Sequence, residues 1–67
     1  MFTLAGIDGN AFNILGHVSQ ALRKSGLKSD IEKYMAEATS GDYNHLLAVS
    51  QKYIDRANEA LGEAGEW

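Results

Sequence analysis

The sequence of 67 residues contains no cysteine and no proline. The lack of cysteine excludes a disulfide framework, a zinc site built on thiolates and a thiol nucleophile. Uninterrupted hydrophobic runs are only a few residues long, too short for a membrane span or for the core of a signal peptide. Basic residues are in the minority, with six Lys and Arg against nine Asp and Glu and a net charge of −3. That charge has the wrong sign for a phosphate-binding surface.

What the chain does contain predicts a folded domain. Hydrophobic residues make up 45% and charged residues 22%, unlike the composition of a disordered tail. Seven glycines divide the chain, and three stretches between them carry hydrophobic residues at helical spacing. We therefore expect one all-α domain, a compact three-helix bundle, over residues 1–67. Its parts are an extended arm or strand (1–8), helices at about 11–25, 30–40 and 43–61, and a frayed tail (62–67).

Local signals mark the helix ends. Asn10 and Asp42 are suited to cap the first amides of the first and third helices. Ser29 and Glu32 are spaced as a capping box for the second helix. Gly26 is expected in the left-handed conformation that ends the first helix. Gly41 is expected to end the second helix with a backbone angle that favours glycine.

The periodicity also predicts which side chains form the core, while the opposite faces are polar. The tyrosines belong mostly to the core, with their hydroxyl groups reaching its edge. Lys52 with Asp55, and Arg56 with Glu59, are spaced for weak ion pairs along the third helix. The predicted core faces are Ala11, Ile14, Leu15, Val18, Ala21 and Leu22; Ile31, Tyr34, Met35 and Ala38; and Tyr43, Leu46, Leu47, Ser50, Tyr53, Ile54, Ala57 and Leu61.

No group of residues indicates catalysis. His17 and His45 are the two side chains that titrate near neutrality, and both are expected on the solvated surface. Neither has the neighbouring ligands that a metal site needs, and no serine lies in a nucleophile motif. We expect no enzyme, no metal and no cofactor. The remaining enzymatic alternative is a subunit that contributes His17 or His45 to an active site shared with another chain.

The first helix has a second side that the core does not explain. Phe12 points away from the hydrophobic stripe and shares its side with Gly16, Ser19 and Arg23. A glycine inside a helix costs about 1 kcal/mol relative to alanine, so it usually marks a close approach by another group. Either the N-terminal arm lies over Gly16, or a protein partner or second copy docks there. These four residues and His45 are the candidate partner-binding residues.

The leading expectation is therefore a small non-enzymatic module that binds a protein partner, with a homodimer as one form of this. The alternative is a nucleic-acid-binding regulator in which the second and third helices form a helix-turn-helix. The exposed face of the third helix has few basic side chains near its start. Neighbouring acidic residues offset the positive charge of Lys52 and Arg56. Nucleic acid is the less favoured partner, and we expect no membrane association.

Two motifs resemble those of a known group. Small uncharacterised proteins from bacteria, phages and plasmids have motifs similar to two segments of this chain. The first segment is Asp8–Phe12 (DGNAF), with Gly16 four residues later, and the second is Ser40–Leu47 (SGDYNHLL). The resemblance covers about residues 4–53, and both motifs are present without departure. It implies a phage or mobile-element setting in the cytoplasm of a bacterial host. The resemblance implies no biochemical mechanism.

Overall fold

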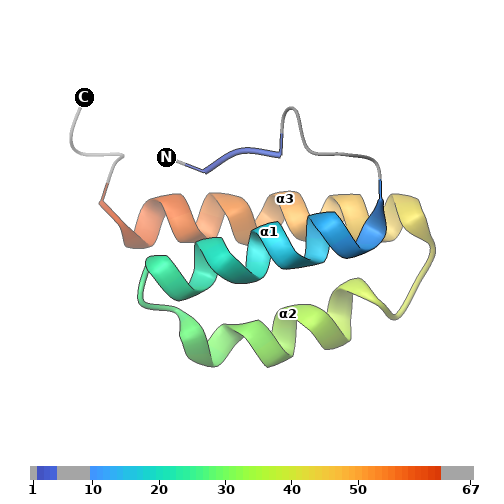
Figure 1. Ribbon diagram of the computed structural model, residues 1–67, viewed down its shortest axis with the longest axis horizontal. Coiled ribbons are helices and arrows are strands. Elements are labelled where there is room, and N and C mark those ends of the chain that lie inside the picture. The colour runs from blue at the N-terminus through green and yellow to red at the C-terminus, as the bar shows by residue number, and fades with distance from the viewer. Residues whose placement is uncertain (1, 5–9, 63–67) are drawn as a thin grey trace.

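In the computed structural model, residues 2–4 and 10–62 are described, and within them the chain forms three helices and no strand. The helices are α1 (Ala11–Lys24), α2 (Ile31–Ala38) and α3 (Tyr43–Ala60), with a 3₁₀ turn, η1 (Lys28–Asp30), before α2. In Figure 1, α1 and α3 run in one direction and α2 returns in the other. The predicted all-α three-helix bundle is confirmed, and the helix bounds agree with the sequence to within two residues.

The caps of α1 and α3 are those predicted. The Asn10 side-chain oxygen accepts the amide of Phe12 at 2.8 Å, and an Asp42 carboxylate oxygen accepts the amide of His45 at 2.9 Å. Such bonds satisfy amides that have no partner within the first turn of a helix. At the other end of α1, Gly26 has φ +83°, and the Leu27 amide donates to the Leu22 carbonyl at 2.8 Å. This is the predicted Schellman ending.

The capping box predicted for the second helix is wrong. Ser29 lies inside η1, and α2 begins two residues later at Ile31. Asp30 stands at the cap position but makes no capping hydrogen bond, because its carboxylate accepts from Arg56 Nε at 2.8 Å. The Asp30 carboxylate therefore binds a residue of α3 and does not cap α2.

The core has the predicted helical stripes with corrections at their edges. Tyr34 is fully buried and its hydroxyl lies 2.7 Å from that of Ser50, so these two polar groups satisfy each other. Met35, Tyr43 and Leu61, all assigned to the core from periodicity, are 38%, 43% and 39% exposed. The buried hydrophobic residues are Ile14, Leu15, Val18, Ala21, Leu22, Tyr34, Ala38, Leu46, Val49, Tyr53, Ile54 and Ala57, of which Val49 was not predicted.

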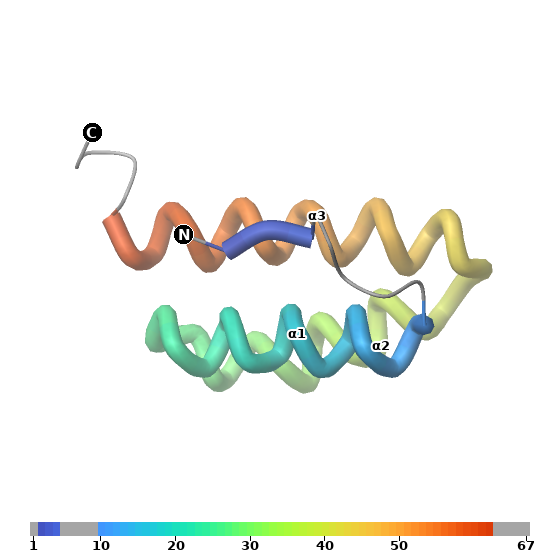
Figure 2. Tube along the Cα trace, turned by 45° about the horizontal axis from the view of Figure 1, so that its top comes forward, coloured from blue at the N-terminus to red at the C-terminus, as the bar shows by residue number. Residues whose placement is uncertain are grey.

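The N-terminal arm packs on its own helices, over a place that was not predicted. The Phe2 amide donates to the Asn58 side-chain oxygen at 2.7 Å, and the Asn58 side-chain nitrogen donates to the Phe2 carbonyl at 3.0 Å. The side chains of Phe2 and Leu4 pack against the core. In Figures 1 and 2 the described part of the arm runs beside α3. Residues 2–4 therefore do not cover Gly16.

The end of α3 is ordered through Gly62, the first residue of the predicted frayed tail. Gly62 has φ +78°, and its amide donates to the Glu59 carbonyl at 2.9 Å. It therefore ends α3 as Gly26 ends α1. Residue 1 and residues 5–9, which together include most of the predicted arm, and residues 63–67 of the predicted frayed tail lie outside the described residues.

Candidate functional site

Four of the five candidate residues share one strip of α1, on which Phe12, Gly16 and Arg23 are exposed and Ser19 is half-buried. Phe12, Gly16, Ser19 and Arg23 follow one another at spacings of four, three and four residues, which keeps them on one side of a helix. Phe12 is 82% exposed. Among the described residues, no atom of another group lies within 4 Å of a Cβ atom built on Gly16, so the glycine faces open space within that part of the chain. The predicted cover by the arm is wrong for the arm residues that the structure describes.

A methionine of α2 extends this strip across the neighbouring helix. The Ser19 hydroxyl lies 3.7 Å from Met35 Sδ, within hydrogen-bonding reach of sulfur. Met35 is one of the large hydrophobic side chains that remain exposed. We call the surface formed by Phe12, Gly16, Ser19, Arg23 and Met35 the α1–α2 face. Periodicity alone placed Met35 in the core, so the sequence did not indicate its role on this surface.

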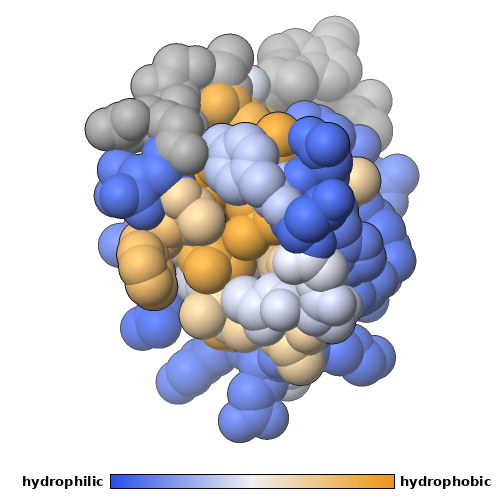
Figure 3. All heavy atoms as spheres, turned by 90° about the vertical axis from the view of Figure 1, so that its right-hand side faces the viewer, coloured by the Kyte–Doolittle hydropathy of each residue, from blue (hydrophilic) through white to orange (hydrophobic). Residues whose placement is uncertain are grey.

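One end of the α1–α2 face opens into a hydrophobic hollow beside Phe12. This Phe12 groove has a volume of about 330 Å³ and lies where α1 begins, α2 ends and α3 begins. Figure 3 views the end of the molecule where these helix ends meet, and hydrophobic atoms gather in the middle of a hydrophilic rim. The lining includes Phe12, Leu15, Ala38, Tyr43 and Leu46, together with the carboxylate-bearing Asp42.

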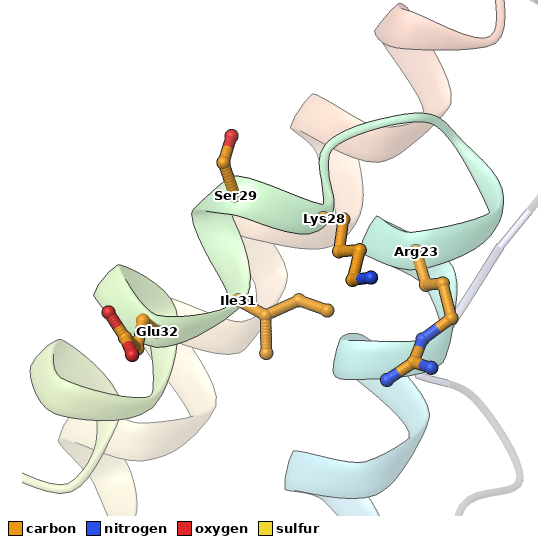
Figure 4. A pocket seen from close by; sticks show the side chains of 5 residues that line it. All are labelled: Arg23, Lys28, Ser29, Ile31 and Glu32. Atoms are coloured by element: carbon orange, nitrogen blue, oxygen red, sulfur yellow. The ribbon is translucent and has the colours of Figure 1, made fainter.

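The opposite end of the face carries positive charge. This second hollow, the Arg23 groove, has a volume of about 690 Å³ and is lined by Arg23, Lys28, Ser29, Ile31 and Glu32. In Figure 4, Arg23, Lys28 and Ile31 point toward the space between α1 and the start of α2, whereas Ser29 points away. Neither base forms an ion pair with any residue that the structure describes. The face therefore runs from an aromatic, hydrophobic end to a basic end.

His45, the fifth candidate, is not brought to this face. Its Nε2 lies 2.8 Å from the Glu37 carbonyl oxygen and 3.3 Å from the Ser40 hydroxyl. Since a carbonyl can only accept, Nε2 carries the hydrogen and donates it to the end of α2. His45 is half-buried, which corrects the prediction of a solvated side chain. It connects the start of α3 to the end of α2.

The close approach of His45 also explains Gly41. This glycine does not have a positive φ, so the predicted special backbone angle is wrong. A Cβ atom at position 41 would lie 2.7 Å from His45 Cγ and 2.9 Å from its Cβ, distances that real side chains do not tolerate. Glycine is required because the imidazole occupies the space of a side chain.

His17 also differs from the prediction of a solvated surface histidine. It is half-buried, and its Nε2 atom is buried without a hydrogen-bond partner among the described residues. On the helix it lies away from the strip that carries Phe12 and Arg23. The structure therefore does not bring His17 and His45 together with the α1–α2 face.

The bases of α3 pair with residues of η1 and α2 rather than within their own helix. Lys52 Nζ lies 3.4 Å from a Glu37 carboxylate oxygen, and Arg56 Nε lies 2.8 Å from Asp30. The predicted pairs within α3 are wrong, and Asp55 instead accepts from Gln51 at 2.9 Å. Both bases near the helix-turn-helix candidate are thus held by carboxylates, which makes this surface a poor match for a phosphate backbone.

The described parts of the chain contain no cluster of three metal-ligating side chains. Within the same residues, no helix has the length and hydrophobicity that crossing a bilayer requires. Comparison with known proteins returns no matching family model, no matching curated protein and no matching solved structure. The candidate site is therefore defined by the geometry of this chain alone.

Proposed function

We propose that this protein is a small non-enzymatic interaction module that binds a protein partner through the α1–α2 face. The observation that carries the proposal is Phe12, an aromatic side chain that is 82% exposed beside the hydrophobic Phe12 groove. Exposing a large aromatic ring costs free energy that a partner could recover by burying it. Aromatic and arginine side chains also supply much of the binding energy in protein interfaces, and both occur on this face.

We propose that a phage or another mobile element encodes this protein and that the protein acts in the cytoplasm of a bacterial host. The support is the resemblance of Asp8–Phe12 and Ser40–Leu47 to motifs of small proteins from such sources. Part of both motifs has a structural explanation, because Asn10 and Asp42 cap helices. Phe12 and Gly16 are motif residues for which the described residues offer no internal role.

Retention of partners by the immobilised full chain tests the proposal. A protein of a bacterial lysate, or the free wild-type chain offered as the partner, should be retained by the immobilised wild-type chain, and Phe12→Ser should lower this retention by at least about tenfold, the effect of removing an interface anchor. Leu61→Ser is the matched control, because Leu61 is also exposed but lies beyond α3 and away from the face. Circular dichroism should show unchanged helix content for both variants.

Equal retention by the wild-type chain and Phe12→Ser would overturn the proposal. The nucleic-acid alternative has its own signature, a salt-dependent mobility shift of duplex DNA that is lost when Lys52 and Arg56 are neutralised. The ion pairs of these bases with Glu37 and Asp30 argue against that outcome.

A further inference from the structure

We infer that the occupant of the α1–α2 face is a second copy of this chain, docked with its α1 antiparallel to the first. This inference rests on the proposed function, since it names the partner of the same face. The two copies would be related by a two-fold axis that lies between the two faces, perpendicular to α1 and opposite its middle. Such isologous dimers are the commonest oligomers of soluble proteins.

The spacing of the strip on α1 is self-complementary. Gly16 lies four residues after Phe12, and Ser19 lies four residues before Arg23. The midpoint between Phe12 and Arg23 is therefore the same as that between Gly16 and Ser19, and it lies between positions 17 and 18. In one antiparallel register, Phe12 lies against Arg23 of the second copy while Gly16 lies against Ser19 of the second copy. The small residues allow the two helix backbones to approach closely at the axis, where Gly16 faces open space in the single chain.

The ends of the face are complementary in the same register. The Phe12 groove contributes an aromatic ring and the Asp42 carboxylate, whereas the Arg23 groove contributes two bases, Arg23 and Lys28, beside one acid. The antiparallel arrangement brings each hydrophobic, acidic end against a basic end. A guanidinium over an aromatic ring is an attractive contact. A parallel arrangement would instead bring the two basic ends together, which the repulsion of like charges disfavours.

The small size of the chain gives self-association an energetic role. A domain of this length buries only about 60% of the surface of its unfolded chain. The exposed Phe12 and Met35 side chains represent hydrophobic surface that the single chain leaves in water. A second copy would cover both side chains in each chain at once.

Disulfide trapping tests the geometry, because the natural chain has no cysteine that could interfere. With a rise of 1.5 Å per residue, the two Ser19 positions lie about 5 Å apart along the axis and the two Asn13 positions about 14 Å apart. A disulfide needs Cα atoms within about 7 Å. Under mild oxidation Ser19→Cys should therefore form a covalent dimer. Asn13→Cys, an exposed position on the same helix but off the face, should stay mostly unlinked.

Sedimentation equilibrium of the full chain tests the association itself. The molar mass should rise with protein concentration from 7.3 kDa toward twice this value. Gly16→Leu, which meets open space in the single chain, should weaken association by at least about tenfold, as loss of a central contact does, while keeping its helix content. Ala48→Leu is the matched control, because Ala48 is exposed on α3 away from the face, and it should associate like the wild-type chain.

A chain that stays at 7.3 kDa at every concentration, or dimers that Ser19→Cys does not trap, would overturn the inference. These failures are distinguishable from failure of the proposed function. If the chain is monomeric but retains another protein through Phe12, the face is an interface for a different partner. If retention does not depend on Phe12 either, both the inference and the proposed function fail.

Discussion

At the scale of single residues, two glycines of the motifs shared with the small bacterial and phage proteins differ in how closely other residues surround them. Gly41 is packed against His45, whose ring would collide with any side chain at position 41. Gly16 lies within α1 and has no neighbour among the described residues. The first glycine is explained by a contact within the chain. The second is not, and its lack of an internal role supports the proposed interface.

Alanine substitutions should separate these two glycines. Gly41→Ala should lower the free energy of unfolding by about 1–3 kcal/mol, because His45 must shift and its bond to the end of α2 is lost. Gly16→Ala should raise it by about 0.5–1 kcal/mol, since alanine is the better helix former and meets no neighbour. Urea unfolding, at a protein concentration low enough to prevent association, measures both. A loss of stability in Gly16→Ala would show that this position is packed within the single chain.

At the scale of the helices, side-chain caps determine where α1 and α3 begin, whereas α2 begins without one. The Asp30 carboxylate pairs with Arg56 of α3, and the Leu27 carbonyl accepts the Asp30 amide at 2.9 Å within the preceding turn. The start of α2 is thus set by η1 and by its contact with α3. Its position depends on the assembled bundle more than on a local signal.

Removal of cap side chains should therefore affect α3 and spare α2. Asp42→Ala should cost about 1 kcal/mol of unfolding free energy, as loss of an N-cap does. Ser29→Ala should change it by less than about 0.5 kcal/mol, as expected for a surface substitution, because Ser29 makes no capping bond in the structure. Urea unfolding of the two variants decides between the observed start of α2 and the predicted capping box. A cost for Ser29→Ala equal to that for Asp42→Ala would favour the capping box.

At the scale of the whole molecule, two tyrosines join α2 to α3 in the core. The Tyr34 and Tyr53 rings lie 5.3 Å apart between centroids, tilted by 60°. Burial raises the pKa of Tyr34 above its ordinary value, although the hydrogen bond with Ser50 opposes this shift. Burial also raises the pKa of Tyr53, and the nearby Glu37 carboxylate adds to the effect. The folded state therefore favours both phenols in the neutral form.

These shifts predict a loss of stability at high pH. The unfolded chain releases the phenol protons near pH 10.0, while the folded chain holds them to higher pH. The stabilisation is thus complete below pH 10.0 and is lost as the pH rises through the raised folded-state values. Urea unfolding between about pH 8 and pH 11 should show this decline.

Tyr34→Phe isolates the contribution of one phenol to this decline. Below pH 10.0 the variant should be less stable by about 1–3 kcal/mol, because the Ser50 hydroxyl loses its buried partner. Its stability should nevertheless decline less steeply at high pH than that of the wild-type chain, since it has one fewer phenol to ionise. Effects of pH that the two proteins share cancel in the comparison. Equal slopes would contradict the buried, neutral state of Tyr34.

The sequence by itself determined the helices, because the signals that define them are local. The Asn10 and Asp42 caps, the Gly26 ending and the stripes of buried side chains all depend on residues within a few positions of one another. The same reasoning placed Phe12, Gly16, Ser19 and Arg23 on one exposed strip of α1. Helical periodicity alone fixes which side of a helix these residues share.

Only the tertiary structure decided which segments meet. The arm pairs with Asn58, which lies 56 residues from Phe2, and no local pattern encodes a contact at that separation. The same holds for Arg56 with Asp30 and for His45 with the end of α2. Met35 remained exposed beside Ser19 because α2 is short and turns only part of its hydrophobic side toward the other helices. Each contact depends on how the three helices pack, which the periodicity of a single helix does not specify.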